Sequence, residues 1–138
     1  MNDTGIPLQT SYFDLLDGNI TGSLYDTVPA SPSYPYTQID DRTMTDYTDK
    51  SNLGQEVTQT VWVVDRFAES VGSRSDLYTI TDEILGIIRA RPNPFNLTGF
   101  NVITSTLDLA NFSRERTETH TYFRMEIRFR HLIEQLNP

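Results

Sequence analysis

The strictest pattern in this chain is an alternation near its C-terminal end, in the segment YFRMEIRFR at residues 122–130. Apolar residues occupy the odd positions of this segment, and Arg124, Glu126, Arg128 and Arg130 occupy even ones. Successive side chains of a β-strand point to opposite faces of the sheet. The pattern therefore predicts a strand with one apolar face packed in a core and one charged face that needs a partner.

A second pattern has the period of an α-helix. In DLYTITDEILGIIRA, residues 76–90, the apolar side chains recur every three or four positions and form one continuous stripe. Arg89 and Arg91 follow, where cations favour the helix dipole, and Pro92 ends the pattern. We predict a helix over 76–90 whose stripe covers the apolar face of the last strand.

Weaker patterns complete the fold. They predict a short helix at 7–17, a weak strand at 20–28 and strands at 36–40, 56–65, 101–111 and 121–132. The polar segment 41–54 is either a long loop or an extended, solvent-exposed hairpin. The fold class is therefore α+β: a single domain over 1–138, with an antiparallel sheet of about four strands and two helices packed on one face.

Composition excludes several classes of function. The chain has 138 residues and no cysteine, which removes disulfides, thiol catalysis and cysteine metal sites. Its net charge is −8 and it holds a single lysine, so it is poorly suited to grip a phosphate backbone. No segment approaches the ~20 consecutive apolar residues of a membrane helix, and MNDTGIPLQT lacks the features of a signal peptide.

The motifs of catalysis are missing too. The chain has no P-loop, no G-x-G-x-x-G and no G-x-S-x-G turn. A metal site would need both His120 and His131 together with a carboxylate, and nothing in the spacing favours that. We predict no catalytic residue, no cofactor and no metal, so the chain is not expected to be an enzyme.

The charged face of the last strand is the best candidate for an interaction. Arg124, Arg128 and Arg130 could face solvent beside acids such as Glu126 on the same face and Asp108 on the preceding strand, or they could contact another subunit. Both interpretations stay open on the sequence alone. The other candidate interface residues are two aromatic side chains and four acids of the first half, namely Trp62, Tyr36, Asp40, Asp41, Asp46 and Asp49.

The order of these segments resembles the tail-completion, or tail-terminator, proteins of long-tailed bacteriophages and of phage-derived particles. A short N-terminal helix is followed by YDTVP, PYTQI, a polar segment and the strand TQTVWVVDRF. The helix SDLYTITDEILGIIRA and the closing strand HTYFRMEIRFRHLIE come next. The similarity runs over nearly the whole chain and lies in order and spacing, not in a single motif.

The resemblance implies a structural role without catalysis. Such proteins form rings, usually hexamers, that cap the head-proximal end of the tail tube, end its polymerisation and meet the connector or stopper protein of the head. DNA passes through the ring as non-specific cargo. The expected location is the virion, at the head–tail interface, after assembly in the host cytoplasm. The alternatives are a head-completion or connector component and a non-viral α+β protein-binding module.

Overall fold

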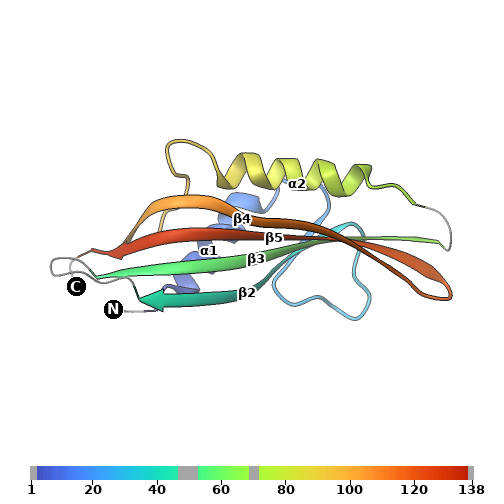
Figure 1. Cartoon of the computed structure of the whole chain (residues 1–138), viewed down its shortest axis with the longest axis horizontal. Helices are drawn as coiled ribbons and strands as arrows, with labels where there is room; N and C mark the ends of the chain where they lie inside the picture. The colour runs from blue at the N-terminus through green and yellow to red at the C-terminus, as the bar shows by residue number, and fades with distance from the viewer. Residues whose placement is uncertain (1–2, 47–52, 69–71, 137–138) are drawn as a thin grey trace.

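The computed structural model describes residues 3–46, 53–68 and 72–136. Two helices and five strands follow one another along this part of the chain (Figure 1). In order they are α1 (Gly5–Leu16), β1 (Ser23–Tyr25), β2 (Tyr36–Asp46), β3 (Gly54–Ala68), α2 (Ser75–Ile88), β4 (Phe100–Arg116) and β5 (His120–Gln135).

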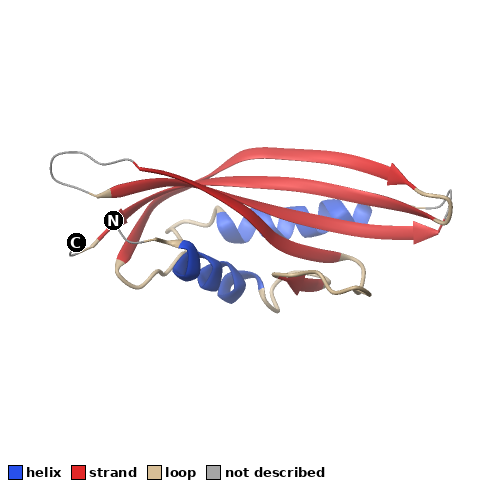
Figure 2. Cartoon of the chain, turned by 90° about the horizontal axis from the view of Figure 1, so that it is seen from below, coloured by secondary structure: helices blue, strands red, loops and turns tan. Residues whose placement is uncertain are grey.

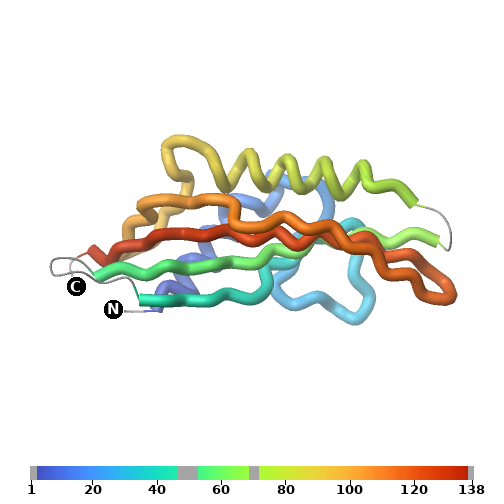
Figure 3. Tube along the Cα trace, in the orientation of Figure 1, coloured from blue at the N-terminus to red at the C-terminus, as the bar shows by residue number. Residues whose placement is uncertain are grey.

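The strands form one sheet in the order β1-β2-β3-β5-β4. β2, β3, β5 and β4 pair antiparallel along most of their lengths, and β5 lies between β3 and β4 (Figure 3). β4 forms one long edge of the sheet. The other edge belongs to β2, because β1 covers only its first three residues, Tyr36 to Gln38.

Both helices lie on the same side of the sheet (Figure 2). The predicted stripe of α2 is buried against the odd residues of β5, and Ile84, Ile88, Ile127 and Phe129 are all fully buried in one core cluster. α1 adds a second layer to the same core through its fully buried residues Leu8, Tyr12 and Leu16. The predicted α+β class, the two helices on one face and the alternation of the last strand are confirmed.

The predicted sheet of about four antiparallel strands is wrong in two respects. The sheet has five strands, and it is mixed, because β1 runs parallel to β2. β1 is three residues long and is joined to β2 by a proline-rich connection, which is long enough to return the chain in the same direction. β1 lies within the weak strand predicted at 20–28, but three residues are too few for a sequence pattern to show its direction in the sheet.

Of the two interpretations of the polar segment 41–54, the long loop is wrong and the extended hairpin agrees with the structure. β2 continues to Asp46 and β3 begins at Gly54, so much of the segment is paired strand. Threonine has a high strand propensity, and Thr43 and Thr45 are exposed on the edge strand β2. Their partners on β3 are the polar residues Thr58 and Glu56, so an apolar side chain is not needed at either position. Residues 47–52, which include Asp49, lie outside the described part of the chain. Neither described helix is long and apolar enough to cross a membrane.

Candidate interaction surface on the open face of the sheet

The face of the sheet opposite the helices is open, and the even residues of β3 and β5 point into it. Tyr36 of β2, Val64 of β3 and Arg124 of β5 lie in one row across the strands. The next row places Trp62 beside Glu126. The strand register thus brings the predicted residues Tyr36, Trp62 and Arg124 together, although they come from three separate segments of the sequence.

Each of the three predicted arginines has a carboxylate partner within the chain. Arg130 lies between Asp108 and Glu56, with nitrogen–oxygen distances of 2.9 and 3.1 Å. Arg128 is 3.7 Å from Asp108 and 3.9 Å from Glu126.

On the same face Arg124 donates to Glu115 on β4. Glu126 lies on β5 itself, and Asp108, Glu56 and Glu115 are cross-strand acids of the kind that the first interpretation of the arginines required. Contact of the same face with another subunit stays a prediction.

A shallow hollow of about 520 Å³ occupies the middle of this face. Its floor is formed by threonines of β2 and β3, and its rim carries charged side chains of both signs. The candidate interface residues that line it are Asp40, Asp41, Trp62, Arg128 and Arg130. A second hollow of about 260 Å³ adjoins it and is lined by Tyr36, Gln38, Asp40, Trp62, Val64 and Arg124. Asp46 lies apart from both, at the exposed end of β2.

One end of the open face carries an aromatic cluster that the sequence analysis missed. The ring of Tyr36 lies 5.4 Å from that of Tyr34, whose ring is 6.4 Å from Tyr122. The Arg66 guanidinium sits 4.5 Å above the Tyr34 ring and that of Arg124 lies 5.3 Å from the Tyr122 ring. Tyr122 shares the parity of Arg124, which was a usable signal, but Tyr34 lies outside any strand. Tyrosine, tryptophan and arginine together are the composition of protein contact surfaces.

The acidity of one hydroxyl in this cluster is shifted by its surroundings. Partial burial, with Tyr34 nearby, raises the pKa of the Tyr36 hydroxyl above its usual value. The phenol therefore stays neutral at physiological pH and can donate a hydrogen bond to a partner.

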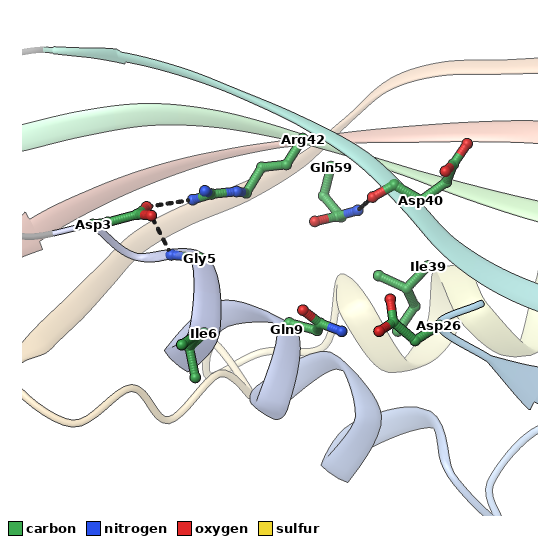
Figure 4. Close-up of a pocket in the computed structure, with 9 residues that line it drawn as sticks. All are labelled: Asp3, Gly5, Ile6, Gln9, Asp26, Ile39, Asp40, Arg42 and Gln59. Carbon is green, nitrogen blue, oxygen red and sulfur yellow. Dashed lines mark hydrogen bonds and ion pairs between the residues drawn. The ribbon is translucent and has the colours of Figure 1, made fainter.

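A third hollow, of about 280 Å³, lies where α1 meets β2 (Figure 4). It includes Asp3, Asp26, Asp40 and Arg42 among its lining residues. The Arg42 guanidinium donates to the Asp3 carboxylate at 3.0 Å, which lowers the pKa of that carboxyl. Asp26 and Asp40 are exposed and pair with no cation among the described residues.

The β2 edge bends at this hollow because of a bulge. The register of β2 against β3 shifts between Ile39 and Arg42. The side-chain amide of Gln59 donates to the backbone carbonyls of Asp40, at 2.9 Å, and Asp41, at 3.3 Å, and so holds the bulge (Figure 4). The bulge places the carboxylates of Asp40 and Asp41 at the border between the open face and the edge.

His131 of β5 is buried in the core. Its Nε2 lies 2.5 Å from the Tyr12 hydroxyl and its Nδ1 lies 2.8 Å from Ser105 Oγ. All three side chains are at most 1% exposed. Burial lowers the pKa of His131 to about 4, so the ring is neutral at pH 7.

This histidine does not form a catalytic or metal site in the described chain. The Ser105–His131 pair has the spacing of a nucleophile and its base, but it is sealed from any substrate. Among the described residues no three His, Asp or Glu side chains are grouped to hold a metal. His131 is therefore a polar link that joins α1, β4 and β5.

Comparison with known proteins identifies the fold. No protein-family model matches the chain, and no curated protein matches it in sequence. Among solved structures, it is similar to a chain of one described as the virion of a native gene transfer agent (GTA) particle. The TM-score is 0.78 at 15% identity, covering 97% of this chain and 99% of that one. The two chains share one fold over nearly their entire lengths.

Proposed function

We propose that this protein is a structural component of a phage-like virion and acts as a tail terminator. In this role it forms a ring, expected to be a hexamer, at the head-proximal end of the tail tube. The ring ends polymerisation of the tube protein and joins the tail to the connector or stopper protein of the head. The protein has no catalytic function in this proposal, and DNA is only cargo that passes through the ring.

The observation that carries the proposal is the end-to-end likeness to a chain of a gene transfer agent virion, with 97% and 99% of the two chains covered. The segment order of the sequence supports the finer role, because it resembles that of tail-terminator proteins. The burial of Ser105 and His131 adds support, since it seals from substrate a serine–histidine pair that could have suggested hydrolysis.

The open face of the sheet is the proposed contact with a neighbouring component of the particle. It has no helix covering it, and its aromatic end combines Tyr36, Trp62 and Tyr122 with Arg124. Truncating a central aromatic anchor in such a surface typically costs 2 kcal/mol or more of binding, roughly 30-fold in affinity. The acidic character of the chain fits a lumen through which DNA slides, because carboxylates repel the phosphate backbone.

The decisive experiment is to delete the gene in cells that produce the particle and to image the products by electron microscopy. We expect tails of abnormal and variable length that are not joined to heads. Complementation with the unaltered gene should restore tails of uniform length.

A different defect would assign the protein elsewhere. Tails of normal length beside unattached heads would overturn the terminator role in favour of a head-completion or connector component. Unchanged particles would overturn the virion role altogether, and a non-viral binding module would then be the remaining class.

A further inference from the structure

The long edges of this molecule differ in charge, and the difference rests on arginines outside the open face. Figure 1 shows α2 and β4 along one long edge and β2 along the other. The first edge, called here the arginine edge, carries five exposed arginines, which are Arg74, Arg89, Arg91, Arg114 and Arg116. None of the five forms an ion pair with another described residue, unlike Arg124, Arg128 and Arg130 on the open face.

The opposite edge is acidic. Asp26, Asp40, Asp41 and Asp46 are exposed on β2 and just after β1, and none has an ion pair among the described residues. The nearest arginine, Arg42, is already bound to Asp3. The arginine edge also holds four carboxylates without an ion pair among the described residues, namely Asp76, Asp82, Glu83 and Glu118. Its unpaired charges are therefore five positive and four negative. Among the described residues, the acidic edge has four unpaired anions and no unpaired cation.

The same two edges carry the exposed apolar side chains. Six large apolar residues are more than a third exposed in the described chain, and five of them lie at these edges. On the arginine edge they are Tyr78, Ile103 and Leu109, and on the acidic edge they are Ile6 and Met44. Apolar groups rimmed by unpaired charge are typical of a protein contact, whereas singly scattered ones are not.

Bulges shape both edges. β4 is irregular between Val102 and Thr104 and again between Leu107 and Leu109, and β2 is irregular beside Asp40. Bulges interrupt the straight row of backbone groups that a further strand would need. The side chains at these edges, more than the backbone, therefore determine what can bind.

We propose that the arginine edge of one copy of this chain binds the acidic edge of a second copy. This inference rests on the ring proposed above and names the surfaces that would close it. The contact is head-to-tail, because it joins two different surfaces, and repetition of such a contact closes a ring when the rotation from one copy to the next is a whole fraction of a turn. The hollow lined by Asp26 and Ile6 receives a guanidinium of the neighbour's arginine edge, which the free Asp26 carboxylate neutralises. The Asp40 carboxylate points away from Asp26, toward the open face, and adds to the negative charge of the edge (Figure 4).

The test is a charge-swap experiment on the full chain, read by analytical ultracentrifugation over a range of concentrations. One variant, Arg91→Glu/Arg114→Glu, reverses one arginine from each end of the arginine edge. The other, Asp26→Lys/Asp40→Lys, reverses two free carboxylates of the acidic edge. The control, Asp14→Lys/Asp17→Lys, changes net charge as the second variant does, but at the C-terminal end of α1.

We expect the unaltered chain to self-associate at low salt and to weaken as salt rises. Each edge variant alone should associate at least about tenfold more weakly, while the control keeps its affinity. An equimolar mixture of the two edge variants should associate again, because every contact in an alternating assembly is once more complementary.

Three results would overturn the inference. They are a chain that stays at its monomer mass of 15.8 kDa at all concentrations, edge variants that assemble normally, and a mixture that fails to associate. Tail length in the deletion strain is measured independently, so the terminator role can stand while this contact fails. The converse outcome, association in solution with normal tails in the deletion strain, would reject the role and leave the contact intact.

Discussion

β5 has two faces with the same backbone and opposite chemistry. Its odd residues Phe123, Met125, Ile127 and Phe129 are buried under the helices, while Arg124 and its even neighbours remain partly exposed on the open face. The side chains of the buried face fit together in one arrangement, because a close-packed core tolerates little change in side-chain volume. The charged side chains of the open face form ion pairs at the surface, and such pairs contribute little to the stability of the fold. One face therefore specifies the fold, and the other is free to serve a contact.

The largest expected effect lies on the buried face. Ile127→Ala should lower the free energy of unfolding by about 2–5 kcal/mol, because Ile127 is fully buried and the substitution leaves a cavity. Urea denaturation followed by circular dichroism measures the change. Glu126→Ala, one residue away on the open face, is the matched control and should cost less than about 1 kcal/mol. Equal losses for the two variants would contradict the assignment of the two faces.

A polar side chain on the buried face makes stability depend on pH. Burial lowers the pKa of His131 from 6.5 to about 4. As pH falls through 6.5 the unfolded chain takes up a proton at this residue and the folded chain does not. Stability is therefore lost between about pH 6.5 and 4, by up to roughly 3 kcal/mol.

Comparing variants isolates this contribution from other groups. The free energy of unfolding of His131→Gln should fall less between pH 7 and 4.5 than that of the unaltered protein. Burial raises the pKa of Asp65, so that carboxyl contributes with the opposite sign, but it contributes equally to both proteins. His120→Gln, at the start of β5, should leave the full loss in place. An unchanged slope in His131→Gln would contradict a buried, neutral His131.

The contrast between the faces also explains what sequence patterns could predict. The alternation of β5 and the stripe of α2 are local signals repeated over many residues, so both elements could be identified. β1 gave only the weak signal at 20–28, because Ser23–Tyr25 has three residues, and its parallel pairing with β2 could not be predicted. The burial of His131 depends on Tyr12, which lies 119 residues away in the sequence.

The candidate interaction surface, like the fold, could be predicted only where a local sequence pattern marks it. The three arginines of β5 stand out because the alternation groups them, and the structure pairs each with an acid of its own chain. Five arginines without an ion pair among the described residues are dispersed between residues 74 and 116, and only the fold brings α2 and β4, beside which they lie, to the same edge. The sequence pattern thus drew attention to the arginines with partners and concealed those without.

A smaller loss is expected from the buried hydrogen bonds that join Tyr12, His131 and Ser105. Tyr12→Phe removes the hydroxyl that contacts His131 Nε2 and leaves a fully buried nitrogen without its partner. The expected cost is about 1–3 kcal/mol of unfolding free energy, measured by urea denaturation. Tyr78→Phe, on the exposed side of α2, is the matched control and should change stability by less than about 0.5 kcal/mol. A neutral Tyr12→Phe would mean that the hydroxyl contributes nothing to holding α1.

The smallest effect should come from the open face itself. Arg130→Gln removes ion pairs to Asp108 and Glu56, yet about half of the arginine side chain is exposed. The expected loss of unfolding free energy is roughly 0–1 kcal/mol, and it should shrink as salt rises. Arg116→Gln, an exposed arginine without an ion pair among the described residues, should cost nothing measurable. Thermal denaturation of both variants at low and high salt measures the difference. A loss above about 2 kcal/mol for Arg130→Gln would mean that the charged face helps to specify the fold, and the contrast between the two faces of β5 would fail.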